Sequence, residues 1–161
     1  MVDLISTRTI DVTKLAMDGL MARQKTITAN IANVMTPGYQ RKDVSFEGQL
    51  REIIAQDDLK TYIKEQNSLE YNPTTLESVI GPQKTQLTPQ QAKYLQSDIY
   101  NKYNPQIVDD TQSGGDATGN NVDLEKEVMD MASVGLKYSV LSTLEQKQLR
   151  NIASAIKGEV S

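Results

Sequence analysis

The 161-residue chain contains no cysteine, histidine or tryptophan, and its formal net charge is −4. These absences exclude a thiolate nucleophile, a disulfide, an imidazole base and a zinc site of the usual kind, so we expect neither an enzyme nor a cofactor. One phenylalanine and no tryptophan leave little aromatic mass for a thick core. The composition instead suits one elongated helical subunit that completes its burial against neighbours.

Charge and hydropathy also limit the kinds of partner. Residues 43–122 carry six basic and twelve acidic side chains, and no basic cluster occurs, which argues against nucleic-acid binding. The chain has no apolar run of about eighteen residues, so no membrane span is predicted. An early acid, Asp3, and the lack of an apolar stretch predict no cleaved secretory signal, which leaves export by a signal-less route open.

The first predicted element is a long helix over residues 3–35, which contains one glycine and no proline. Its apolar side chains recur with a helical period close to a heptad seam, and an adjoining face is rich in small residues. We expect the seam to meet the C-terminal helix of the same chain and the small-residue face to contact neighbouring subunits. The seam includes Leu20, Ile27 and Ile31, and the small-residue face comprises Ala16, Gly19, Ala22 and Ala29.

A second long helix is predicted over residues 122–158. Asn121 or Asp123 can cap its start, acidic residues follow in the first turns, and Gly158 marks its end. Two terminal helices of matched length predict a mainly α protein built on an antiparallel, coiled-coil-like hairpin. The expected packing line of the second helix, spaced by four and three, runs through Leu124, Val128, Met131, Gly135 and Tyr138.

Between the helices, residues 36–121 form an irregular region of the same single subunit. Its prolines and glycines interrupt helices and are kept out of central strands. We expect a short helix over residues 46–54 that can extend towards Gln66, another over residues 88–103, and room for a β-hairpin. Residues 111–121 are small and polar, as in a flexible connector. Asp109 and Asp110 open a stretch that lacks the ligand order of a calcium loop, so no metal site is predicted.

The densest local signal closes the first helix. Pro37 should end that helix near Met35, and Pro37–Gly38 suits the centre of a type II turn with Gly38 at positive φ. Two asparagines precede the turn on one face of the helix. They either satisfy the last carbonyls and bond the returning chain, which is the more frequent role, or mark a binding site. The signal comprises Asn30, Asn33, Thr36, Pro37, Gly38 and Tyr39.

These residues carry a resemblance to a known family. With Asn30-Ile31-Ala32-Asn33 followed by Thr36-Pro37-Gly38-Tyr39, the chain resembles the bacterial flagellar rod, hook and hook-associated axial proteins, in which an N-x-A-N-x-x-T-P-G-Y pattern closes the N-terminal helix. Residues 119–131 and Leu136-Lys137-Tyr138 are most similar to the opening of the C-terminal helix in the proximal rod members. Other rod and hook members typically carry Tyr-x-Ala-Asn where this chain has Tyr138-Ser139-Val140-Leu141.

The resemblance implies a structural subunit of the basal-body rod, exported through the type III apparatus without signal cleavage and stacked helically into a drive shaft across the periplasm. It implies as partners further copies of the chain, other rod proteins and, at the rod base, the adaptor FliE, the MS ring and the export gate. The competing class is a soluble helical adaptor or type III secretion chaperone that binds client helices. That class explains the acidity and the amphipathic helices, but not the Thr-Pro-Gly-Tyr turn beside the paired asparagines.

Overall fold

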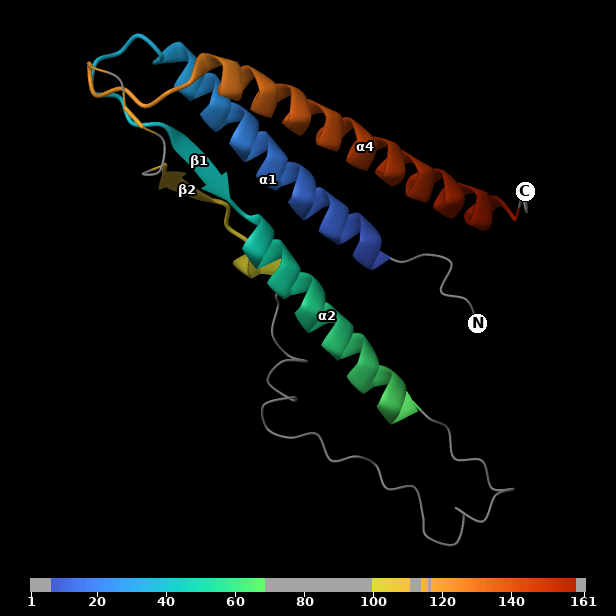
Figure 1. Ribbon diagram of the computed structural model, residues 1–161. Helices are drawn as coiled ribbons and strands as arrows, with labels where there is room; N and C mark the ends of the chain where they lie inside the picture. Colours follow the sequence, from blue (N-terminus) through green and yellow to red (C-terminus); the bar gives the residue numbers. More distant parts are fainter. Residues whose placement is uncertain (1–6, 69–99, 111–113, 116, 159–161) are drawn as a thin grey trace, which may run out of the picture. The chain divides into compact units, whose positions relative to one another are not determined.

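The computed structural model describes residues 7–68, 100–110, 114–115 and 117–158. The chain divides into two compact units, Met1–Leu50 with Asn104–Ser161 and Arg51–Tyr103. Across the described residues, no helix is both long and apolar enough to cross a membrane. In chain order the elements are α1 (Thr7–Ala32), β1 (Lys42–Ser45), α2 (Glu47–Ser68), the 3₁₀ helix η2 (Tyr100–Lys102), β2 (Gln106–Asp109) and α4 (Leu124–Lys157) (Figure 1).

The two long helices of the first unit lie side by side and run in opposite directions (Figure 1). At about 1.5 Å per residue, the 26 residues of α1 and the 34 of α4 span about 39 and 51 Å. The prediction of a mainly α protein with paired terminal helices is therefore confirmed. Helix α1 ends at Ala32, three residues before the predicted Met35, because the backbone already turns at Asn33, whose carbonyl accepts from the N–H of Thr36.

Both ends of α4 are capped. The Asp123 side chain, at φ −100°, accepts hydrogen bonds from the N–H groups of Glu125 and Lys126, and is the cap among the two predicted candidates. Gly158 closes the helix in the left-handed region at φ 73°, where glycine carries no Cβ penalty. Asn121 has another role, because its side chain bonds segments outside α4.

The strands β1 and β2 pair antiparallel, with Lys42 opposite Asp109 and Ser45 opposite Gln106. They come from segments on either side of α2, so the pair is a long-range contact and not the local hairpin that the sequence left room for. The helix predicted over residues 46–54, with an extension towards Gln66, is present as α2 and continues to Ser68. Of the helix predicted over residues 88–103, the structure describes only η2, and the remainder lies outside the described residues.

The apolar core of the first unit is small and includes Leu20, Ile27, Val44, Phe46 and Val134, each at most 4% exposed. The inward line of α4 does not run through Leu124 and Val128, which are 47% and 54% exposed. It runs through Glu127, which is fully buried, and then Val134. The predicted line shares Met131 and Tyr138 with it, which are half-buried. The sequence pattern missed Glu127 because an isolated glutamate is costly to bury, and only the folded chain shows its partners.

Candidate functional site

Buried polar side chains meet where α1 ends and α4 begins, and Asn30 in the last turn of α1 is the first of them. Asn30 is fully buried. Its Oδ1 accepts from the N–H of Lys42 at 3.0 Å, and its Nδ2 donates to the Lys42 carbonyl at 2.7 Å. The same Nδ2 donates to Glu127 Oε2 at 3.0 Å, and the Tyr39 hydroxyl donates to Oδ1 at 3.2 Å. Asn30 therefore holds the chain that returns from the turn and joins it to α4.

Arg41, just before β1, bonds three carboxylates, one of which is that of Glu127. Its Nε donates to Glu127 Oε1 at 2.5 Å, its Nη1 to Asp110 Oδ2 at 3.0 Å and its Nη2 to Asp130 Oδ2 at 3.1 Å. The Arg41 side chain is 6% exposed and the Glu127 side chain 0%. One guanidinium thus joins α4 to the residue before β1, which is Arg41 itself, and to the residue after β2, which is Asp110. We call this set the polar cluster: Asn30, Arg41, Asp110, Asn121, Glu127 and Asp130.

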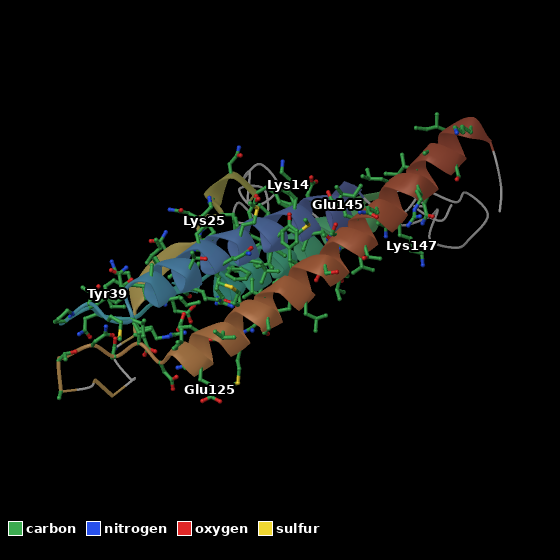
Figure 2. The ribbon with its side chains drawn as sticks, turned by 90° about the horizontal axis from the view of Figure 1, so that it is seen from above. Lys14, Lys25, Tyr39, Glu125, Glu145 and Lys147 are labelled. Carbon is green, nitrogen blue, oxygen red and sulfur yellow. The ribbon has the colours of Figure 1, made fainter. Side chains whose placement is uncertain are left out.

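The polar cluster is electrostatically negative, since one arginine faces three carboxylates. Burial acts to lower the pKa of Arg41, but its hydrogen bond with Glu127 and the nearby carboxylate charges leave it raised. Burial and then the charges of Glu127 and Asp109 raise the pKa of Tyr39. Both shifts favour a charged guanidinium and a neutral phenol. Tyr39 lies at the same end of the helix pair as Glu125 of α4 (Figure 2).

Two asparagines before α4 bond distant segments of the chain, and only the second, Asn121, was predicted to have a role. The Nδ2 of Asn120 donates to the carbonyls of Asn33, Val34 and Thr36 at 2.9, 3.0 and 2.9 Å, which belong to the turn that follows α1. Asn121 Oδ1 accepts from the N–H of Arg41, and its Nδ2 donates to the Asp110 carbonyl at 2.8 Å. The only available signal was a pair of polar amides directly before a helix cap.

The predicted turn after α1 is present. The N–H of Tyr39 donates to the Thr36 carbonyl at 3.2 Å, and Gly38 has φ 73°, as the third position of a type II turn requires. The N–H of Gly38 donates to the Thr118 carbonyl, which ties the turn to the segment before α4. Asn33 bonds locally, because its Nδ2 donates to the Ala29 carbonyl and its Oδ1 accepts from the Thr36 hydroxyl.

Replacing Gly38 with alanine is expected to lower the free energy of unfolding by about 1–2 kcal/mol, because an L side chain is disfavoured at positive φ. No atom lies within 4 Å of a Cβ built there, so backbone conformation alone accounts for the cost. Gly48 in α2 is the matched control, since its Cβ would also meet open space and its φ is not positive. Alanine there should stabilise by up to about 1 kcal/mol. Urea unfolding followed by circular dichroism measures both, and equal effects would contradict the conformational argument.

A second ionic group, around Arg23 in α1, fixes the strand and the start of α2. Its guanidinium donates to Asp43 at 3.1 Å, to both carboxylate oxygens of Glu47 and to the Val44 carbonyl, and lies 4.9 Å from the centre of the Phe46 ring. Burial acts to raise the pKa of Glu47, but the hydrogen bond and charge of Arg23 hold it below its ordinary value. No sequence pattern predicted this group, because Arg23 lies 20 and 24 residues before Asp43 and Glu47 and meets them only in the folded chain.

The comparisons with known proteins agree with this geometry. The family model of the flagella basal body rod proteins matches residues 15–40, the segment that contains the end of α1 and the turn. The flagellar basal body rod protein FlgB of Borreliella burgdorferi is 26% identical to this chain over 93% of the chain and 96% of its own length. The FlgB proteins of Bacillus subtilis and Salmonella typhimurium are 27% and 24% identical, each over 84% of this chain and 83% of their own length.

The chain is similar to flagellar basal body rod proteins. The family model ends at Gln40, directly before Arg41, so it covers Asn30 and the turn but not the arginine of the polar cluster. The similarity to the Borreliella burgdorferi relative extends over nearly the whole chain. Among the described residues, no group of three or more acidic side chains is arranged to hold a metal ion.

The predicted packing faces are partly covered within the single chain. Gly19 is already buried, so a bulky residue there would disturb the subunit's own packing before any contact with a neighbour. Ala29 and Val128 remain exposed in the single chain. Of the other predicted residues, Leu20 and Ile27 are buried, whereas Ala16, Ala22, Ile31, Met131 and Tyr138 are half-buried.

Proposed function

We propose that this chain is a structural subunit of the bacterial flagellar basal-body rod that assembles helically with copies of itself and with other axial proteins. It has no catalytic role in this proposal and transmits torque and load by helix packing. The similarity to flagellar basal body rod proteins supports a basal-body location. The proximal position, the export without signal cleavage and the periplasmic site of assembly rest on the sequence resemblance, as do contacts with FliE, the MS ring and the export gate.

The observation that carries this proposal is that α4 is apolar on opposite sides. Its inward side contains Val134, which is 4% exposed. Leu136 follows two residues later, about 200° around the helix, and is 69% exposed. Met129 and Val140 lie on the same outward side and are 63% and 53% exposed. An apolar stripe on the outer side of an already paired helix supports packing against another subunit.

The outward stripe gives the test of the proposal. Replacing Leu136 with lysine should lower the amount of the chain recovered with sedimented basal bodies about tenfold or more, because burying one leucine is worth about 1.5–3 kcal/mol and about 1.4 kcal/mol is a factor of ten. Swimming motility should fall with it. The free energy of unfolding of the isolated chain should change by no more than about 0.5 kcal/mol, since Leu136 is exposed.

Ser139→Lys is the matched control, because it adds the same charge at an exposed position of α4 without removing an apolar side chain. It should leave recovery with basal bodies unchanged. If Leu136→Lys sediments normally, the outward stripe is not a subunit contact. If the unaltered chain itself stays in the soluble fraction and binds isolated client helices there, the adaptor or chaperone function replaces the rod function.

A further inference from the structure

The inward line of α4 repeats with heptad spacing for most of the helix. Its buried and half-buried members follow steps of four and three and comprise Glu127, Met131, Val134, Tyr138, Leu141, Glu145, Gln148 and Ile152. Such a repeat is what keeps one helix in contact with another along its length. The spacing alone would let α4 shift by whole heptads and still keep this line against α1, so the repeat by itself leaves the register open.

A shift of one heptad shows how little the apolar positions discriminate. Val134 would then take the place of Glu127, and Leu141 the place of Val134. At Val134 one apolar side chain replaces another, which cores tolerate at small cost. The place of Glu127 would instead receive a side chain that cannot accept from Arg41 or Asn30, and Glu145 and Gln148 would move to the places of Tyr138 and Leu141. The alignment therefore has to be decided by the polar positions.

We propose that the polar cluster sets the axial register of α4 against α1, so that Glu127 is the residue that selects one alignment of the helix pair. Its two carboxylate oxygens accept from donors on different segments, Nε of Arg41 and Nδ2 of Asn30, and neither donor can follow α4 if it slides. The next carboxylate on the inward line is Glu145, too far along α4 to replace Glu127 after a shift of one or two heptads. In any shifted alignment a buried arginine or glutamate loses its partner, which the protein interior strongly disfavours.

The segment before α4 reinforces the same alignment. Asn120 reaches the carbonyls that follow α1, and Asn121 bonds the Arg41 N–H, so both asparagines meet their partners only when α4 begins beside the end of α1. Single polar residues in a heptad seam are known to specify register at a cost in stability. This inference concerns the single chain and does not depend on the proposed rod function.

The absence of cysteine allows a direct measurement of register in the full-length chain. Spin labels at Lys25→Cys and Lys147→Cys would report one distance, because both side chains are exposed, one on each helix, and they lie far apart along the pair (Figure 2). A shift of one heptad moves α4 by about 10.5 Å along its axis. Pulsed electron–electron double resonance should give one narrow distance distribution for the spin-labelled chain that carries no other substitution.

The test variant replaces the buried pair together, as Arg41→Met with Glu127→Leu, so that Glu127 is not left as a fully buried carboxylate without its cation. We expect helix content within about a tenth of the wild-type value and a second distance displaced by several ångströms, up to about 10.5 Å. Asp123→Ala is the matched control, since its cap bonds lie within α4, and it should keep the single distance. If the double variant loses its helices, Glu127→Gln decides in the same way.

Each result bears on the proposal. A second distance in the double variant, or in Glu127→Gln where the double variant is unfolded, with a single distance in Asp123→Ala, supports it. One unchanged narrow distance in the deciding variant overturns it, because the apolar seam then fixes the register alone. A broad distribution in the wild-type background overturns it as well, since the intact cluster would not have selected one alignment.

Discussion

Replacing Arg41 with methionine is expected to lower the free energy of unfolding by about 3–5 kcal/mol, because it leaves a buried carboxylate without its cation. The Glu127 side chain is fully buried, and Arg41 is its cationic partner in the polar cluster. Asp110 and Asp130 lose the same guanidinium. Methionine keeps much of the arginine's apolar stem, so the loss reports on charge and hydrogen bonding more than on volume. Urea unfolding of the full-length chain, followed by far-ultraviolet circular dichroism, gives the value.

Lys42→Met is the matched control for this prediction, since the Lys42 side chain is exposed and only its backbone atoms bond Asn30. Its effect should stay within about 0.5 kcal/mol. Adding Glu127→Leu to Arg41→Met should recover much of the stability, because a buried pair replaced by apolar residues is far less costly than a broken one. A loss of stability below about 1 kcal/mol for Arg41→Met alone would show that the guanidinium is not what holds the cluster together.

Replacing Asn120 with alanine should destabilise the chain by about 2–3 kcal/mol, since it removes the donor that serves three backbone carbonyls after α1 and leaves them without that partner. The Asn120 Oδ1 also accepts from the Val122 N–H, so the approach to α4 loosens at the same time. Hydrogen exchange should show the change locally as faster exchange at the N–H groups of Thr36 and Gly38, which lie in the turn that Asn120 holds.

Gln40→Ala provides the comparison for Asn120, because Gln40 is an exposed amide that also bonds across to the segment before α4, donating to the Gly119 carbonyl at 2.9 Å. Its loss should cost no more than about 0.5 kcal/mol, since water can replace an exposed hydrogen bond. Similar losses in the free energy of unfolding for the two substitutions would mean that the burial of Asn120 does not strengthen its hydrogen bonds to the turn after α1.

Features that depend on neighbouring residues could be predicted from the sequence. The turn at Pro37–Gly38 followed from the fixed φ of proline and the freedom of glycine, and Gly38 has the expected positive φ. Asp123 and Gly158 cap α4 for equally local reasons. Where the prediction erred, at the end of α1, the carbonyls after Ala32 are taken by Asn120, which lies more than eighty residues away in the chain.

The polar cluster could not be predicted in the same way. The sequence pattern marked Glu127 only as one of the acids in the first turns of a helix, and it gave Arg41 no role. Each is tolerable inside the protein only because the other is there, and their separation of 86 residues leaves no local signal. The inward line of α4 was misplaced for the same reason, since the pattern favoured Val128 over a glutamate.

The sequence by itself determined that the chain is mainly helical, where its two long helices lie, how they are capped and that a Thr-Pro-Gly-Tyr turn follows the first. These are properties of short segments, in which periodicity, caps and turn residues act within a few positions. Only the tertiary structure decided which side of α4 faces α1 and which side is left outward, because that choice depends on whether buried polar groups find partners. The pairing of Glu127 with Arg41 and Asn30 made that choice.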